Sequence, residues 1–294
     1  MRKIYLILPI LAGIMFGSSG IFVRTLTQNG IDPTTLLFLR FSIAIIPILI
    51  TILLTDRRLF RIGLSDLPLF LACAVCIIGL NLCYNESMNT VSLSLAAVLL
   101  SLAPIYVLVI AYFLFKERIT IKKMICMILA IFGCILMTGV LETPFKSIPL
   151  FGILSGIGAG LFWAFYLMAS KKSIEMGNHT YTILIYSIIF ITIALIPFTD
   201  FRQISSFISI DPVLTILFLI LHSTFSFALP YILSTLSLNH MDSGISSILL
   251  SGAEPLAALI FGLAIYSEIP TILMFSGFVL TLIAMMMLSL KTTE

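Results

Sequence analysis

Long apolar runs are the feature that most constrains what this chain can fold into. A helix needs about 20 consecutive apolar residues to cross a bilayer, and runs of this kind follow one another with short connections rich in turn-forming residues. A transmembrane β-barrel is excluded, because its strands would alternate polar and apolar residues. We therefore predict an all-α integral membrane protein with ten transmembrane helices, at residues 4–28, 33–55, 67–88, 91–115, 121–140, 150–172, 180–199, 212–238, 242–266 and 271–290.

Composition excludes the soluble classes of protein. Of the 294 residues, 60% are hydrophobic and 10% are charged, whereas a soluble domain carries roughly 25% charged residues. Too few charges remain to cover a soluble surface, and the apolar content excludes a disordered chain, a secreted disulfide scaffold and a nucleic-acid-binding protein. The expected surroundings are a lipid bilayer, with no nucleic acid partner.

The five cysteines all lie inside apolar runs. Cys73 and Cys76 have the spacing of a metal or redox motif, but no second pair lies near them in the sequence. Buried cysteine behaves as a small hydrophobic residue. We therefore expect packing rather than a metal site, and we expect no cofactor.

Positive charges predict the orientation in the membrane. In the ten-span arrangement one side receives twelve lysines and arginines and the other side receives two, Lys146 and Arg202, while Arg24 and Arg40 lie within spans. Lysine and arginine accumulate on the cytoplasmic side of membrane proteins. The predicted location is thus the cell (inner or plasma) membrane, crossed many times, with both termini in the cytoplasm.

The chain also repeats itself. At an offset of 151 residues, Pro104 corresponds to Pro255 and Glu117 to Glu268, and an apolar stretch separates the proline from the glutamate in both copies. The repeats predicted from this match are residues 1–145 and residues 146–294, with five spans each. Because five is odd, the second repeat enters the membrane from the opposite face. Inverted repeats of this kind build alternating-access transporters, with the substrate site near the midplane between the halves.

The repeat carries a resemblance to a known family. The matching segments are Gly17–Arg24 in the first span, Leu39–Phe41 in the second, Ala103-Pro104 with Lys116–Arg118 in the first repeat, and Glu254-Pro255 with Ser267-Glu268 in the second. They resemble the drug/metabolite transporter superfamily of EamA type. The resemblance implies ten helices, cytoplasmic termini, a central cavity and substrates such as amino acids, metabolites, nucleotide sugars or drugs, which are often exported. One departure is Ala103, which corresponds to Glu254, so any role of Glu254 belongs to one half only.

Glu254 is the first candidate site residue. It lies in the middle of a predicted span, where a carboxylate is costly and usually functional. Ser243, Ser247 and Ser251 precede it at helical spacing, so the four share one face, which we expect to meet protein or water rather than lipid. Substrate binding and proton coupling are the functional interpretations. A hydrogen bond to a neighbouring helix beside Pro255 is the alternative.

Two arginines inside spans are further candidates for substrate contact. Arg24 shares a face with Gly13, Gly17 and Gly20, whose spacing predicts close helix packing. Arg40 lies in the outer half of the second span. For either arginine the alternatives are an internal ion pair, for example with Glu86, or a side chain that reaches to the membrane surface.

The remaining candidates are aromatic and polar residues in the middle of spans. An aromatic ring beside a glycine seam can hold a ring or a cation, and histidine titrates near neutral pH. The alternatives are ordinary packing of the aromatic rings and a hydrogen bond between the histidine and its neighbouring serine. The substrate-binding candidates of this group are Asn81, Tyr84, Asn85, Trp163, Tyr166, His222 and Ser226, with Ser251 from the serine face, and the candidate hinges are Pro104, Pro230 and Pro255.

We therefore expect a transporter, and an exporter in particular, of a small organic solute such as an amino acid or a related metabolite. No Gly-x-x-x-x-Gly-Lys motif occurs, so ATP is not the expected direct energy source. One alternative is an intramembrane serine hydrolase that uses Ser19 of the segment Gly17-x-Ser19-Gly20, with His222 as the base. A lipid flippase or scaffold is the other. Proton coupling and a homodimer are left open.

Overall fold

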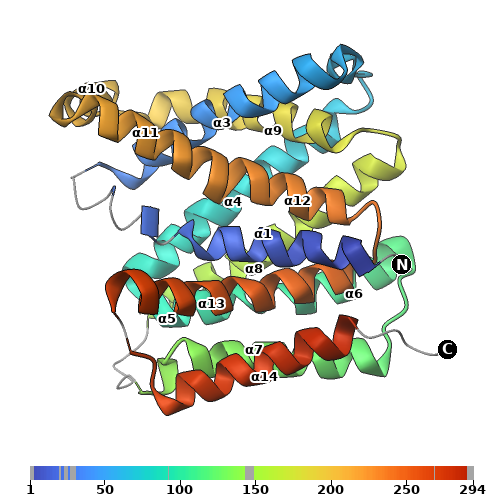
Figure 1. Ribbon diagram of the computed structural model, residues 1–294. Coiled ribbons are helices and arrows are strands. Elements are labelled where there is room, and N and C mark those ends of the chain that lie inside the picture. Colours follow the sequence, from blue (N-terminus) through green and yellow to red (C-terminus); the bar gives the residue numbers. More distant parts are fainter. Residues whose placement is uncertain are drawn as a thin grey trace.

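The computed structural model describes residues 3–19, 21–22, 26, 31–91, 93–142, 149–267 and 269–289, and the regular structure in these ranges is entirely helical (Figure 1). The α-helices are α1 Ile7–Gly17, α3 Pro33–Thr55, α4 Leu67–Thr90, α5 Leu93–Leu100, α6 Ala103–Phe115, α7 Ile121–Met137, α8 Leu150–Glu175, α9 Thr180–Leu195, α10 Phe201–Ile210, α11 Pro212–Ser223, α12 Leu229–Ser237, α13 Ser243–Tyr266 and α14 Ile272–Ser289. Short 3-10 helices lie at Lys3–Leu6, Arg57–Phe60, Val140–Glu142 and Ile196–Phe198, and a π-helical segment joins α11 to α12 at Thr224–Ala228.

Eight helical segments of the described chain are long and apolar enough to cross a membrane. They are Pro33–Thr55, Leu67–Thr90, Leu95–Phe115, Leu150–Glu175, Thr180–Phe198, Pro212–Ser237, Ser243–Ile265 and Ile272–Ser289. Each corresponds to one of the ten expected spans. Of the other two, α1 has 11 residues and α7 has 17, which is shorter than the eight. The count of ten therefore stays a prediction, while the class of multi-pass membrane protein is established.

The helices lie in successive rows across the bundle (Figure 1). α7 and α14 pair along one side, α4 and α8 pair in the centre, and α1 packs between α12 and α13. α3 contacts α9 and α11 on the opposite side from α7. The start of α1 and the end of α14 lie at the same end of the bundle (Figure 1). Large apolar side chains such as Leu54 and Phe113 stay exposed on the outside, as expected of a surface that meets lipid.

Glycine brings α1 against α13. A Cβ atom added at Gly13 would collide with the backbone oxygen of Leu250, and one added at Gly17 would collide with the backbone oxygen of Glu254. Small residues at this spacing allow close approach of helices in a membrane. The predicted close packing is thus confirmed at Gly13 and Gly17, and it places α1 directly beside Glu254; Gly20 and Arg24 lie outside the described residues.

The candidate hinge prolines have three different surroundings. The expected span 91–115 is interrupted at Ser101 and Leu102, and Pro104 lies in the first turn of α6. Pro230 lies in the first turn of α12, directly after the π-helical segment. Pro255 lies inside the continuous helix α13. A missing backbone N–H breaks or loosens a helix, and the structure shows this effect around Pro104 and Pro230.

One helix was missed by the sequence interpretation. The stretch between the expected spans 180–199 and 212–238 was read as a short connection, but residues Phe201–Ile210 form α10. The carboxylate of Asp200 accepts hydrogen bonds from the backbone N–H groups of Arg202 (2.9 Å) and Gln203 (3.3 Å). An aspartate followed three residues later by glutamine is a helix-start signal, and this signal was available in the sequence.

Candidate functional site

The middle of the bundle contains polar and aromatic side chains that come from helices far apart in the sequence. Arg40 comes from α3, Asn81 and Tyr84 from α4, His222 from α11, Tyr231 from α12 and Glu254 from α13. Polar side chains at membrane depth are costly unless they face protein or a water-filled space. This group of side chains is therefore the main candidate for a substrate site.

Arg40 has no ionic partner within the described part of the chain. Its Nη2 donates a hydrogen bond to Oδ1 of Asn81 at 2.6 Å, and its buried Nε has no hydrogen-bond partner. The guanidinium carbon lies 5.1 Å from the ring centroid of Phe227 and 5.3 Å from that of Phe41. The ion pair between Arg40 and Glu86 that was considered from the sequence does not form. A cation held by one amide and two aromatic faces retains the capacity to bind an anionic group.

Glu254 likewise makes no ion pair with a described residue. Its backbone lies against Gly13 and Gly17 of α1. Its carboxylate lies within electrostatic range of the phenol groups of Tyr84 and Tyr231. Tyr231 is also within electrostatic range of Arg40, and its ring centroid lies 4.5 Å from that of Phe227, the ring beside the Arg40 guanidinium. Asn85 lies next to Tyr84 on α4 and is half-buried.

Trp163 belongs to a packed aromatic cluster. Its ring stacks on Tyr166, with centroids 5.3 Å apart, and meets the rings of Tyr231 and Phe16 edge-on at 5.6 and 5.7 Å. The Tyr166 hydroxyl is 2.6 Å from the hydroxyl oxygen of Thr235. Only 5% of the Trp163 surface is exposed, and this environment favours the packing interpretation in the conformation described.

His222 and Ser226 do not interact as the sequence spacing suggested. Neither ring nitrogen of His222 has a hydrogen-bond partner among the described residues, and its ring stacks on Phe22 at 5.4 Å. The Ser226 oxygen instead lies 3.3 Å from that of Ser18, the residue directly after α1. The interpretation of a His222–Ser226 hydrogen bond is therefore wrong. The reason is that residues four apart share a face only in a regular α-helix, and the π-helical segment Thr224–Ala228 changes that register.

The same geometry bears on the hydrolase alternative. A serine nucleophile requires a base within hydrogen-bond reach, and His222 makes no hydrogen bond to Ser19 or to any other described residue. The structure thus gives no support to the pairing of Ser19 with His222.

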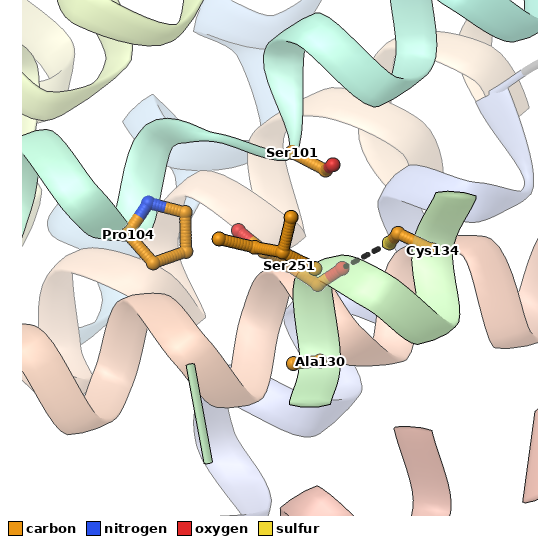
Figure 2. A pocket seen from close by; sticks show the side chains of 6 residues that line it. Ser101, Pro104, Ala130, Cys134 and Ser251 are labelled. Carbon is orange, nitrogen blue, oxygen red and sulfur yellow. Dashed lines mark hydrogen bonds between the residues drawn. The ribbon is translucent and has the colours of Figure 1, made fainter. Parts of the chain in front are cut away.

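A small pocket lies beside the break between α5 and α6 (Figure 2). The Cys134 thiol donates a hydrogen bond to the backbone oxygen of Ser251 at 3.7 Å across it. The space between its side chains is too narrow to admit a water molecule, so it is far smaller than the roughly 300 Å³ of the smallest ordinary ligand sites. Its lining consists of Ser101, Pro104, Ala130, Ile131, Cys134 and Ser251. Of the predicted site residues, Ser251 and Pro104 therefore meet here, away from Arg40.

The cysteine motif packs as predicted. Cys73 is fully buried, its sulfur lies 3.6 Å from the hydroxyl oxygen of Ser170, and Cys76 is also buried. No group of three or more metal-ligating side chains occurs among the residues that the structure describes. Both cysteines belong to the main hydrophobic core.

The sequence interpretation missed part of this region. Phe227 and Tyr231 contact Arg40 or lie beside it, and Phe16 joins the aromatic cluster, but none of the three was a candidate. A usable signal was present, since Phe227 and Tyr231 are spaced four residues apart around Pro230, where an interrupted helix exposes backbone groups. The contacts themselves depend on helix packing that the sequence does not display.

Comparison with known proteins gives a consistent set of matches. A family model described as the EamA-like transporter family matches residues 3–139 and 150–290. An uncharacterized transporter from Clostridium kluyveri is 25% identical over 227 residues, which are 74% of this chain and 72% of the relative. Another, from Archaeoglobus fulgidus, is 26% identical over 201 residues, 68% of each chain. A solved crystal structure shares the fold with a TM-score of 0.81 at 15% identity, over 98% of this chain and 96% of the other.

Proposed function

Because the chain belongs to the EamA-like transporter family, we propose that this membrane transporter exports a small organic solute of the amino-acid type across the cell membrane. One observation carries the choice of solute. Arg40 and Glu254 are an unpaired cation and an unpaired carboxylate among the described residues, and Tyr231 lies within electrostatic range of both. A zwitterion offers one group of each sign and would neutralise both.

The proposed binding mode assigns a role to each end of the solute. Arg40, steadied by Asn81, receives the carboxylate of the solute, and Glu254 receives its ammonium group. Tyr84 and Tyr231 supply hydroxyl groups between them. Arg24 is a further proposed contact outside the described residues. Trp163, Tyr166, Asn85, His222, Ser226 and Ser251 remain proposed contacts of a more open conformation.

The proposed mechanism is alternating access between two inverted repeats, residues 1–145 and 146–294, with ten spans and both termini in the cytoplasm. The sequence match at an offset of 151 residues and the uneven distribution of lysine and arginine support it. Pro104, Pro230 and Pro255 are the proposed hinges, two of them at interrupted helices. In this proposal Glu254 also exchanges a proton during the cycle, since a carboxylate without a partner is the group best placed to do so.

A binding experiment tests the solute class. Purified protein is heated with amino acids, with carboxylic acids that lack the amine, and with amines that lack the carboxylate; a bound ligand raises the melting temperature by mass action. We expect shifts with amino acids alone and loss of those shifts in Arg40→Gln. The matched control Arg57→Gln changes an exposed arginine in a surface turn and is expected to bind like wild type. Equal increases in melting temperature in Arg40→Gln and wild type would contradict the proposed site.

A transport experiment tests proton coupling. Glu254→Gln keeps the size of the side chain but cannot ionise. If Glu254 exchanges the proton, vesicles that contain this variant still exchange the solute across the membrane but lose the accumulation that a pH gradient drives in wild type. Undiminished gradient-driven accumulation in Glu254→Gln would contradict the coupling role and leave the solute assignment standing.

A further inference from the structure

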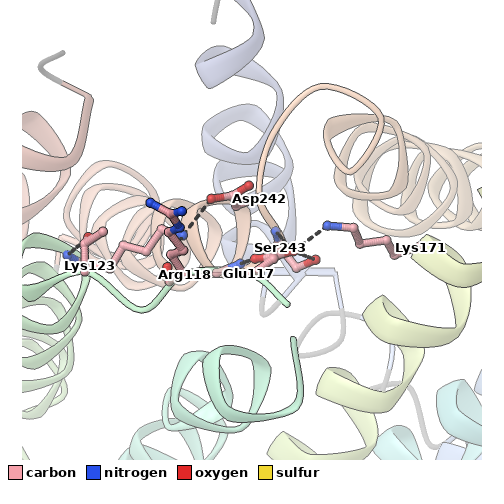
Figure 3. Close-up of polar contacts among 8 residues, drawn as sticks. Glu117, Arg118, Lys123, Lys171, Asp242 and Ser243 are labelled. Atoms are coloured by element: carbon pink, nitrogen blue, oxygen red, sulfur yellow. Dashed lines mark hydrogen bonds and ion pairs between the residues drawn. The ribbon is translucent and has the colours of Figure 1, made fainter. Parts of the chain in front are cut away.

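Glu117 lies at the corner between α6 and α7 and receives hydrogen bonds from two other helices (Figure 3). Its Oε1 accepts from the backbone N–H of Ser243 at 2.9 Å and from the Ser243 hydroxyl at 2.8 Å, and its Oε2 accepts from the backbone N–H of Gly244 at 3.3 Å. The Lys171 ammonium, from α8, forms an ion pair with the same carboxylate. Glu117 is 8% exposed, so these contacts replace almost all of its hydration.

A second charged pair lies beside it. The Nζ atom of Lys123 lies 2.6 Å from Oδ2 of Asp242 and donates to the backbone oxygen of Arg118 at 2.9 Å (Figure 3). Lys123 is 5% exposed. Asp242 precedes the first residue of α13, where an aspartate usually caps the helix with its own side chain, but it makes no such cap here. Its carboxylate binds Lys123 instead, and Glu117 supplies the missing cap from the corner between α6 and α7.

These contacts connect distant parts of the chain at one end of the bundle. Glu117 and Lys123 flank the corner that follows α6, whereas Asp242 and Ser243 begin α13 and Lys171 lies near the end of α8. This is the end at which α1 and α13 begin and α14 ends (Figure 1). A carboxylate at a helix N-terminus satisfies free backbone N–H groups and the positive end of the helix dipole. The contacts therefore fasten the first half of the chain to the second.

The contacts of Glu117 lie at the start of the serine face of α13, which begins with Ser243. Ser247 is one turn deeper than Ser243, is fully buried, and has a hydroxyl with no hydrogen-bond partner among the described residues. Ser251 and Glu254 follow on the same face. A polar stripe thus runs from Glu117 toward Glu254, and the contacts of Glu117 close the end of the stripe that lies farthest from Glu254.

We propose that Glu117, Lys123, Lys171 and Asp242 form a latch that closes the cytoplasmic end of this polar stripe and opens once in each transport cycle. The inference rests on the proposed alternating-access mechanism. Charged contacts suit this task, because every member of the latch finds water when it opens, whereas an apolar closure would expose hydrophobic surface. The latch is formed when the cytoplasmic side of the transporter is closed. It breaks before Glu254 becomes exposed to the cytoplasm.

Thiol labelling tests the latch without any substrate. The background replaces the five native cysteines with alanine and carries Ser247→Cys, which is nearly isosteric. In inside-out vesicles a membrane-impermeant maleimide reaches the cytoplasmic face. We expect slow labelling behind the intact latch and labelling about tenfold faster in Glu117→Gln, because a charge-assisted hydrogen bond is worth at least that factor in an equilibrium. The matched control Glu175→Gln breaks an exposed ion pair with Lys172 on α8 and is expected to leave the rate unchanged.

A charge exchange makes the test independent of the folding of Glu117→Gln. Lys123→Asp and Asp242→Lys are each expected to speed labelling at Ser247→Cys, and the double variant is expected to return it toward the background rate. Equal labelling in the background and Glu117→Gln, or a double variant no slower than the single ones, would overturn the latch. If the labelling behaves as expected but no solute is transported, the latch stands and the proposed function fails.

Discussion

Lys116 and Ser267 end two helices 151 residues apart with the same left-handed backbone, at φ of 54° and 55°. They are the two non-glycine residues with positive φ among those described. Each occupies the position before the glutamate of the sequence repeat, Glu117 or Glu268. Such a conformation is uncommon outside glycine, so its recurrence at matching positions supports the proposal that the two halves are repeats of one unit.

A β-branched residue at either position is expected to destabilise the protein. The left-handed conformation costs an L-residue about 1–2 kcal/mol, and branching at Cβ raises that cost. Lys116→Val and Ser267→Val should each lower the melting temperature in detergent, and Lys116→Gly should not lower it. Because Lys116 is exposed, lost packing does not explain such a result. A Lys116→Val variant as stable as wild type would show that this corner relaxes freely.

Close packing of α1 on α13 gives a second prediction. Gly17→Ala is expected to cost about 1–3 kcal/mol, the usual range for overpacking a tight contact, because the added Cβ collides with the backbone oxygen of Glu254. Gly158→Ala is the control, since its added Cβ would lie at ordinary contact distance, 3.4 Å from the sulfur of Cys83. Thermal unfolding of both variants measures the difference. Similar melting temperatures would mean that α1 can move away from α13 without cost.

Acid is expected to weaken the latch. Burial alone would raise the pKa of Glu117, but hydrogen bonds from Lys171 and Ser243 outweigh it and lower that pKa below its ordinary value of 4.5. A carboxylate with a lowered pKa in the folded protein stabilises it above the ordinary value, and this stabilisation is lost as the pH falls through the lowered pKa. Lys171 forms an ion pair with the Glu117 carboxylate, and Arg118 and the Lys123–Asp242 pair lie beside it (Figure 3).

Melting temperatures of wild type and Glu117→Gln at several pH values measure this effect. Their difference is expected to be constant from neutral pH down to about pH 5 and to shrink below it, as protonation removes the charge that the variant already lacks. A difference that grows toward low pH would contradict the sign of the pKa change.

The sequence predicts the membrane fold well because long apolar runs have few structural solutions. It also predicts the approach of another helix at Gly13 and Gly17, since small residues at helical spacing have few other uses in a membrane. The prediction that His222 bonds to Ser226 was wrong, because a π-helical segment changes the helical register. Sequence periodicity does not reveal such a segment. Glu117 was recognised as a repeat position only, since its partners Lys171 and Ser243 are 54 and 126 residues away in the sequence.

The central claim is that Arg40 binds the transported solute, and the initial rate of exchange in proteoliposomes tests it most directly. The probes are radiolabelled alanine, leucine and phenylalanine, measured separately with wild type, Arg40→Gln and the control Arg57→Gln at equal amounts of folded protein. Wild type and Arg57→Gln are expected to exchange at least one probe. Arg40→Gln is expected to exchange it at least about tenfold more slowly, because a charge-assisted hydrogen bond is lost. Exchange by Arg40→Gln at the wild-type rate would contradict the account.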